Sequence, residues 1–284
     1  MRDLHVAGLT VRYGHFVAVD NVSFDVPGGS VLGLAGESGS GKSTVARAIA
    51  GLTRSRGTVR LGDADLRRAQ RSGGARGRRM VQMIFQDPTS SLDPRFTVRE
   101  CIAEALPGRT YTDRGKRNER VAELLSVVAL DPGISGLHPR MLSGGQRQRV
   151  AIARALAAGP EVLIADEATA SLDVSVQAVV LNLLKQIQRD MGLTMLFITH
   201  NLAVVRYVCD DLAILNHGKI AEHGPAGQVL DRPQDPYTAA LVGAVLRPGS
   251  RLAATDSAPP ERAEPADTAA SRSDGRGTSD HLHR

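Results

Sequence analysis

The stretch that decides the fold is Gly36-Glu37-Ser38-Gly39-Ser40-Gly41-Lys42-Ser43-Thr44. Its three glycines let backbone N–H groups turn inward around phosphate oxygens, and Lys42 carries a positive charge to the β- and γ-phosphates. Ser43 supplies a hydroxyl of the kind that binds Mg²⁺. The preceding residues 30–35 are typical of a short apolar strand, and residues 42–52 of a helix whose N-terminal dipole strengthens an anion site. The stretch therefore predicts a nucleotide-binding loop between a strand and a helix.

A second pattern supplies the acids that such a site needs. Residues 162–165 are typical of a buried strand, and Asp166 and Glu167 follow it directly. The strand can place Asp166 beside Ser43, where its carboxylate would hold Mg²⁺ through water. Alternation along the strand directs Glu167 elsewhere, as a candidate base for the water that attacks the γ-phosphate. The alternative is that both acids cap the next helix.

Two more polar residues follow predicted strands. Gln86 comes after the strand at 80–85, and its amide could reach metal or water from a mobile loop. His200 ends the strand at 194–199. A lone histidine there is usually a packing or capping residue, but beside the other pieces it is a candidate clamp on the γ-phosphate.

The segment Leu142-Ser143-Gly144-Gly145-Gln146 opens another predicted helix. Two glycines and a serine at a helix N-terminus form an anion site of their own, although a simply capped helix is the alternative. One phosphate loop already wraps one triphosphate, so this second site needs a different nucleotide. We therefore expect two head-to-tail chains that enclose two ATP molecules, each bound by one chain's loop and the other chain's 142–146 segment.

The rest of the chain alternates strands with helices and predicts an α/β fold, a P-loop NTPase with a mainly parallel central sheet. The valine-rich strands at 4–13 and 17–26 indicate an N-terminal antiparallel β subdomain. Helical periodicity between residues 97 and 130 indicates an inserted helical subdomain, at about 88–141. A last helix is predicted at 236–246, and the Ala-, Pro-, Ser- and Asp-rich residues 249–284 are expected to be a disordered tail.

Composition excludes several classes of protein. Of the 284 residues, 42% are hydrophobic and 3% aromatic, as expected for an aliphatic globular core. The longest stretch without Asp, Glu, Lys or Arg, residues 191–205, is too short for a membrane helix. Much of the net charge of +5 comes from nine arginines in residues 54–79, which we interpret as a solvated hairpin or surface loop with mobile glycines, not as a nucleic-acid site.

Taken in order and spacing, these motifs resemble the ATP-binding subunit of an ABC transporter over residues 4–246, within an ATP-binding domain at 1–248. Three segments, 85–95, 172–177 and 235–241, further resemble the branch that serves dipeptide, oligopeptide and nickel importers. The resemblance implies an ATPase that uses ATP and Mg²⁺ and powers uptake through membrane permeases. Peptide is the leading solute, and nickel or a metal chelate is the second. Import itself depends on this resemblance alone.

The resemblance also assigns roles to residues. Tyr13 would stack on adenine, unless it is a strand-end core tyrosine, and Asp173 would lie at the dimer seam with Ser143, Gly144, Gly145 and Gln146. The helical lobe, with Gln86 as its hinge, would receive a permease helix. The partners implied are permease subunits, a second ATP-binding subunit (in a homodimer or a heterodimer) and, indirectly, an extracytoplasmic solute-binding protein, with nucleic acid not expected. The protein would lie peripherally on the cytoplasmic face of the cell membrane.

Two features depart from relatives. Ala168 stands where many relatives have proline, which should change loop stiffness more than chemistry. Some members of the branch carry a cysteine cluster near the C-terminus, but only Cys101 and Cys209 occur here, as reduced thiols by expectation, so no iron–sulfur cluster is predicted. The alternative functions are a non-transport ABC-type ATPase acting on nucleic acid or the ribosome, and a P-loop kinase, against which residues 142–146 argue.

Overall fold

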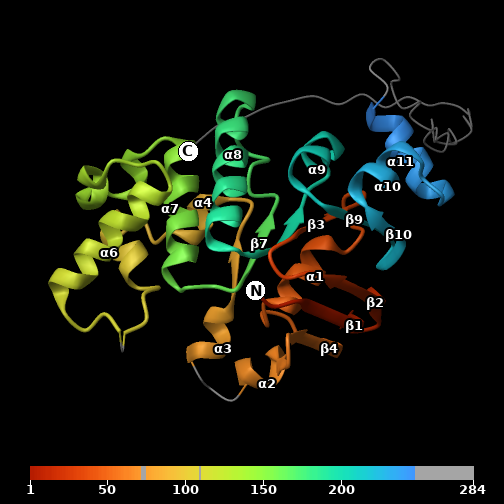
Figure 1. Ribbon diagram of the computed structural model, residues 1–284, viewed down its shortest axis with the longest axis horizontal. Coiled ribbons are helices and arrows are strands. Elements are labelled where there is room, and N and C mark those ends of the chain that lie inside the picture. The colour runs from red at the N-terminus through yellow and green to blue at the C-terminus, as the bar shows by residue number, and fades with distance from the viewer. Residues whose placement is uncertain (72–74, 109, 247–284) are drawn as a thin grey trace, which may run out of the picture. The chain divides into compact units, whose positions relative to one another are not determined.

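Two β-sheets form the framework of the molecule (Figure 1), and the computed structural model describes residues 1–71, 75–108 and 110–246. The larger sheet has the strand order β10-β9-β3-β8-β7-β6, with β10 antiparallel to its neighbour and the others parallel. The smaller sheet, β2-β1-β4-β5, is antiparallel. The strands are β1 (Leu4–Tyr13), β2 (Phe16–Val26), β3 (Val31–Ala35), β4 (Arg56–Leu61), β5 (Ala64–Asp65), β6 (Val81–Ile84), β7 (Val162–Asp166), β8 (Thr194–Ile198), β9 (Asp211–Asn216) and β10 (Lys219–Pro225). The predicted fold class is confirmed.

Helices cover the larger sheet and form the lobe that is yellow and green in Figure 1. They are α1 (Lys42–Ile49), α2 (Leu66–Arg71), α3 (Ala75–Met80), α4 (Pro88–Ser91), α5 (Val98–Ala103), α6 (Arg114–Val127), α7 (Gly144–Ala157), α8 (Val174–Met191), α9 (Leu202–Val208), α10 (Ala226–Asp231) and α11 (Pro236–Leu246), with the 3-10 helices η1 (Pro132–Gly136) and η2 (Pro139–Met141). None of these helices combines the length and apolar character that a membrane crossing requires.

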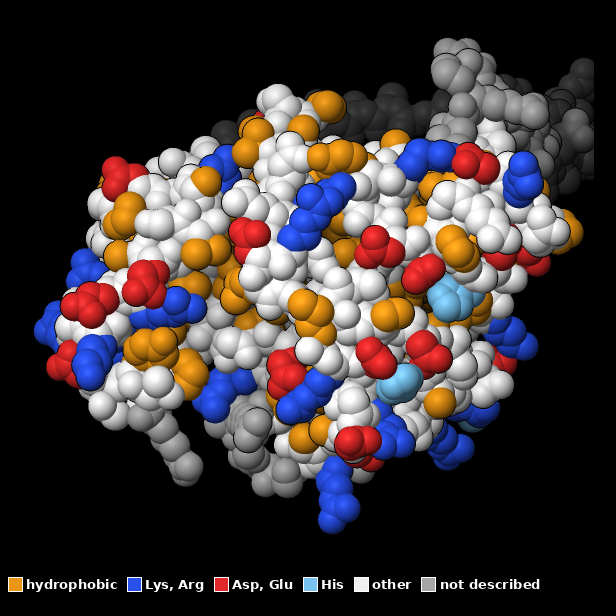
Figure 2. Space-filling model, in the orientation of Figure 1, with side chains coloured by type: hydrophobic (Ala, Val, Ile, Leu, Met, Phe, Trp, Pro, Cys, Tyr) orange, Lys and Arg blue, Asp and Glu red, His pale blue; other side chains and the backbone are white. Residues whose placement is uncertain are grey.

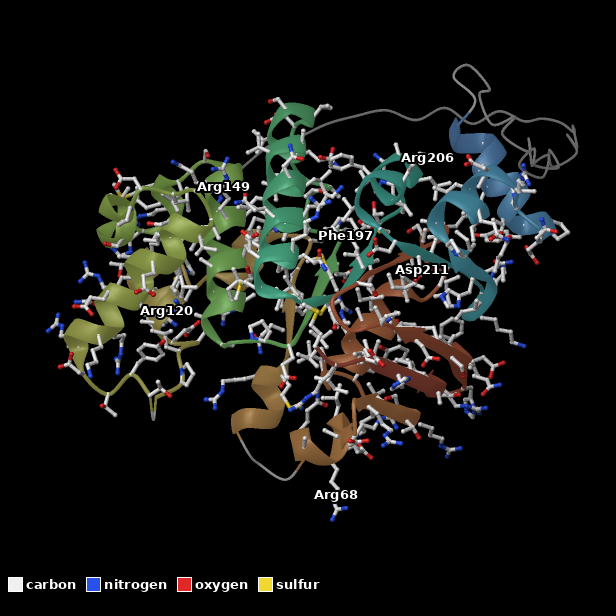
Figure 3. All side chains as sticks on the ribbon, viewed as in Figure 1. Arg68, Arg120, Arg149, Phe197, Arg206 and Asp211 are labelled. Atoms are coloured by element: carbon white, nitrogen blue, oxygen red, sulfur yellow. The ribbon has the colours of Figure 1, made fainter. Side chains whose placement is uncertain are left out.

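The central strands are apolar on both faces because both faces are covered. Along β8, Leu196 and Ile198 join a core with α1 and the smaller sheet, whereas Met195 and Phe197 join a second core with α7, α8 and the lobe. Phe197, labelled in Figure 3, is 1% exposed. Because every residue of β3 and β7 is also buried, the carboxyl ends of these strands are held rigidly where the phosphate loop and the acidic pair begin.

The lobe between β6 and β7 is helical, as the periodicity predicts, and its helices carry clear start signals. Thr97 and Glu100 form a capping box at α5, and the Asp113 carboxylate accepts the Lys116 N–H at the start of α6. Leu125 of α6 packs in the same apolar core as residues of α5 and α7. The predicted limits of the ATP-binding domain, 1–248, and of its helical subdomain, about 88–141, remain a proposal.

The arginine-rich segment differs from the prediction. Residues 64–65 do form a hairpin with β4, but helices α2 and α3 follow it in place of a surface loop. A Cβ on Gly77 would lie 2.2 Å from the backbone oxygen of Ala69, so this glycine allows close packing of the two helices. The side chain of Arg68 points away from the protein body (Figure 3). On the face of the molecule drawn in Figure 2, acidic side chains are interspersed with basic ones. Gly73, Gly74 and the predicted tail at 249–284 lie outside the described residues.

Candidate nucleotide site

A cleft of about 360 Å³ opens beside the phosphate loop. Its walls come from the β1–β2 hairpin, the start of α1, and the segments that follow β6 and β7. The residues that line it are Tyr13, Phe16, Ala18, Ser38, Gly39, Gly41, Lys42, Ser43, Thr44, Gln86 and Glu167. Residues predicted from four separate motifs therefore meet in one cavity.

The backbone of the phosphate loop explains two of its glycines. Gly36 has φ 147°, and a Cβ there would lie 2.2 Å from the carbonyl oxygen of Leu215. Gly41 has φ 107°, and a Cβ there would lie 2.6 Å from the carbonyl oxygen of Ala18. The loop is therefore pressed against β9 on one side and β2 on the other, where a side chain would disrupt it. Gly218, in the β9–β10 turn, donates its N–H to the Ser40 carbonyl at 2.9 Å and fixes the loop further.

Lys42 is buried and bonds to its own loop. Its Nζ donates to the carbonyl oxygens of Gly36 at 2.9 Å and Glu37 at 2.6 Å, and lies 3.4 Å from Ser40 Oγ. Burial lowers the pKa of Lys42, and the nearby carboxylates of Glu167, Asp166 and Glu37 partly oppose that shift. The ammonium group is thus desolvated in advance at the place where phosphate charge would enter, which strengthens its attraction for an anion.

Ser43 and Asp166 meet as the motifs predict. Ser43 Oγ donates to Asp166 Oδ1 at 3.0 Å, although the two residues are 123 positions apart in the chain. Burial raises the pKa of the Asp166 carboxyl, and the bond from Ser43 offsets part of that rise. A hydroxyl and a carboxylate oxygen at this distance suit a hard cation such as Mg²⁺, which prefers oxygen ligands and keeps several waters.

Glu167 lines the cleft in an unusual backbone conformation. Strand β7 ends at Asp166, and Glu167 follows with φ 47°, in the left-handed region that non-glycine residues rarely adopt. This turn therefore sets the direction of the Glu167 side chain. The prediction that strand alternation sets that direction is wrong, because the strand ends one residue earlier. His200 Nδ1 lies 3.1 Å from Glu167 Oε1. Backbone strain of this kind persists where the surroundings enforce it, and it is frequent at active sites.

The β1–β2 hairpin brings two aromatic rings to the mouth of the cleft. Tyr13 is 50% exposed, so it is not a core residue at the strand end, and Phe16 pairs with it across the turn at 66% exposed. Exposed aromatic faces suit stacking on a flat base. The sequence analysis does not identify Phe16, although its place between the predicted strands at 4–13 and 17–26, close to Tyr13, could have indicated it.

Gln86 lies where the sequence predicts, after β6 on the wall of the cleft, and it is exposed. Its backbone carbonyl is 3.5 Å from the Ser171 Oγ, just before α8. The segment between β6 and α4 therefore touches the segment that leads to Asp173.

The segment Leu142–Gln146 lies at the start of α7, and none of its residues lines this cleft. Ser143 Oγ accepts the Gln146 N–H at 3.3 Å, and Gln146 Oε1 accepts the Ser143 N–H at 2.9 Å, so the helix is also capped in the ordinary way. A Cβ on Gly145 would lie 2.5 Å from Val176 Cγ1, which gives that glycine a packing reason. Asp173 caps α8, and its pKa is lowered by the hydrogen bond from Ser175.

Comparison with known proteins decides the family of this chain. Residues 19–170 match the ABC transporter family. The chain belongs to that family. It is 44% identical to the oligopeptide transport ATP-binding protein OppF of Bacillus subtilis, over 83% of this chain and 78% of the relative. It is 42% identical to the di/tripeptide transport ATP-binding protein DppF of Pseudomonas aeruginosa, over 84% of this chain and 74% of that protein.

A solved structure supports the assignment of this chain to the ABC transporter family. The ATP-binding cassette MJ0796, in a dimeric, post-hydrolysis state bound to ADP and phosphate, matches with a TM-score of 0.68 and 28% identity, over 78% of this chain and 98% of that chain. The predicted family, fold class and ATPase activity are confirmed. The roles of individual residues, the metal and the partners are proposals.

Proposed function

We propose that this ABC ATPase is the ATP-hydrolysing subunit of an importer and powers the uptake of peptides through partner permeases. The observation that carries the proposal is that Lys42, Ser43 and Glu167 line one cleft. Asp166 is hydrogen-bonded to Ser43 behind this lining. Its relatives OppF and DppF are named for oligopeptide and di/tripeptide transport, which supports peptide as the solute class.

In the proposed site, the cleft binds ATP with its adenine at the aromatic hairpin and its phosphates in the loop. Tyr13 stacks on the base. The loop N–H groups and Lys42 hold the phosphates. The residues of the loop that take part are Gly36, Ser38, Gly39, Ser40, Gly41, Lys42, Ser43 and Thr44.

For hydrolysis, Glu167 accepts a proton from the attacking water, which is the ordinary task of a positioned carboxylate. His200 is held by Glu167 and reaches toward the γ-phosphate. Gln86, which also lines the cleft, orients the water. Residues that would hold Mg²⁺ are Ser43, Gln86 and Asp166, and when bound the ion neutralises phosphate charge.

The second half of each site comes from another cassette. Five residues are not among those that line the cleft of their own chain, so we assign them to the nucleotide of the partner. They are Ser143, Gly144, Gly145, Gln146 and Asp173. Nucleotide binding then closes the dimer and hydrolysis opens it. The helical lobe receives a permease helix, which places the subunit peripherally at the cytoplasmic face of the cell membrane.

Glu167→Gln tests this proposal. The variant should bind ATP as the wild type does, because the amide keeps the size and polarity of the side chain. Turnover should fall by about 10²- to 10⁴-fold, the usual contribution of a general base. Phosphate release and equilibrium binding of a fluorescent ATP analogue measure the two effects. Glu119→Gln, at an exposed position on α6, is the matched control and should keep full activity. Undiminished hydrolysis by Glu167→Gln would remove the catalytic assignment.

A further inference from the structure

Helix α11 reaches the phosphate loop through Tyr237. The Tyr237 hydroxyl accepts the backbone N–H of Glu37 at 3.3 Å, across 200 positions of sequence. The carbonyl oxygen of the same residue, Glu37, accepts Lys42 Nζ at 2.6 Å. The second residue of the loop is therefore held on its N–H side by the C-terminal helix and on its C=O side by the lysine of the site.

The first turn of α11 is anchored by a series of polar contacts. Asp235 Oδ1 accepts the N–H groups of Tyr237 at 2.8 Å and Thr238 at 3.2 Å. The carboxylate of Glu222, on β10, accepts the N–H groups of Gln234 at 3.0 Å and Asp235 at 3.1 Å. Because β10 belongs to the larger sheet, Tyr237 is tied to the same framework as the loop.

Apolar packing fixes the tyrosine as well. Tyr237 and Leu241 pack against an apolar cluster that contains Leu202 of α9, Ile214 of β9 and Leu230 of α10. A ring held in this way has little freedom to move, so its hydroxyl stays in place as a hydrogen-bond acceptor. The position of the hydroxyl is thus determined by the fold and not by the loop that it contacts.

We propose that Tyr237 is a positioning residue of the phosphate loop, which makes α11 part of the nucleotide site. The inference rests on the proposed function, since it concerns the binding of nucleotide by the same loop. By holding the Glu37 peptide, Tyr237 keeps the loop in the shape that receives phosphate before the nucleotide arrives. An ordered site loses less freedom on binding and therefore binds more tightly.

Tyr237→Phe tests the inference because it removes the hydroxyl and leaves the ring. The loss of one neutral hydrogen bond should weaken nucleotide binding about two- to tenfold. ATP and ADP should be affected equally, since the loop N–H groups bind phosphates that both nucleotides carry. The KM for ATP should rise by a similar factor while kcat stays within about twofold, the pattern seen when a contact made equally in the ground state and the transition state is lost.

The matched control is Tyr207→Phe, on α9, where the hydroxyl donates to Asn182 and not to the loop. It should leave both dissociation constants unchanged. Thermal unfolding is measured for both variants, and the midpoint of Tyr237→Phe should stay within about 2 °C of the wild type, the small shift expected when a chain of this size loses one weak hydrogen bond.

Unchanged affinity for both nucleotides in Tyr237→Phe would overturn the inference. Weakened affinity for ATP alone would also overturn it, because the effect would then act at the γ-phosphate or the dimer seam. A large loss of thermal stability would assign Tyr237 to packing only and would overturn it too. Wild-type protein that binds neither nucleotide would overturn the proposed function together with this inference, whereas normal binding in both proteins removes the inference alone.

Discussion

His200 Nδ1 lies 3.1 Å from Glu167 Oε1, which joins the segments that follow two neighbouring parallel strands, β7 and β8. When the Glu167 carboxylate is ionised it can only accept a hydrogen bond, and Nδ1 then carries the proton of the pair. The other ring nitrogen, Nε2, is then left to face a ligand. The exposed fractions of the side chains, 63% for His200 and 20% for Glu167, show that the histidine is the more accessible member of the pair.

We expect His200→Ala to lower kcat by about 10²-fold, the order lost when one donor to a developing charge is removed. The dissociation constant for ATP should change much less, because the phosphate loop and Lys42 remain. Phosphate release under saturating ATP and nucleotide titration measure the two quantities. His223→Gln, at an exposed position on β10, should behave as the wild type.

Two conservative variants separate the possible tasks of His200. The amide of Gln can replace Nε2, whereas the shorter Asn can replace Nδ1. If His200 acts by contacting the γ-phosphate, His200→Gln should keep more activity than His200→Asn. Greater activity in His200→Asn would show that the histidine only orients Glu167, and it would contradict the role of clamp.

The two cysteines should resist alkylation in the folded protein. Cys101 is 1% exposed, and burial raises its pKa to about 11. Burial also raises the pKa of Cys209, which packs beside Gly33. A raised pKa leaves less thiolate, the reactive form, so at pH 8 a thiol like Cys101 is ionised in about one molecule per thousand. Labelling should therefore be slow at pH 8 and should rise only well above it.

Iodoacetamide treatment at pH 8, followed by mass spectrometry, measures this reactivity. Neither cysteine should be modified in the native protein, and both should be modified in guanidinium chloride. Ser126→Cys, at an exposed position on α6, provides a control thiol that should react in the folded protein. Rapid modification of Cys101 in the native state would show that the core of the lobe opens.

The phosphate-binding side of the site could be predicted because its residues are close in sequence and their chemistry demands that spacing. The strand ends at Asp166 and His200 were also predictable, since continuous apolar stretches mark buried parallel strands. Even so, the conformation of Glu167 was not, because nothing in the residue type indicates a positive φ. The strand order, with β3 between β8 and β9, depends on packing across the whole sheet.

Local patterns failed where a few residues act through distant contacts. The short helices α2 and α3 carry many arginines and have little apolar periodicity, so Leu66 and Met80 alone gave too weak a signal. Gly77 resembled a flexible linker residue and is instead a close-packing position. The bond between Tyr237 and Glu37 joins two segments through the folded sheet, and sequence spacing carries no information about it.

The strongest test of the shared active site is Ser143→Arg. An isolated chain of the variant should bind nucleotide as the wild type does, because Ser143 is not among the residues that line the cleft of its own chain. ATP hydrolysis should fall by at least about 10²-fold, since the arginine would occupy the position of the partner's phosphate contact. Nucleotide titration of dilute protein, phosphate release and the nucleotide-dependent dimer mass measure these effects.

The control for Ser143→Arg must separate the loss of a helix cap from the loss of a nucleotide contact. Thr97 provides it, because Thr97 and Glu100 form the same kind of capping box at α5 that Ser143 and Gln146 form at α7. Either substitution should cost about 1 kcal/mol of folding stability through the lost cap. Only Ser143→Arg should abolish hydrolysis and the dimer, whereas Thr97→Arg should keep both. Equal loss in the two variants would mean that Ser143 only begins its helix, and that each cassette completes its reaction without the other.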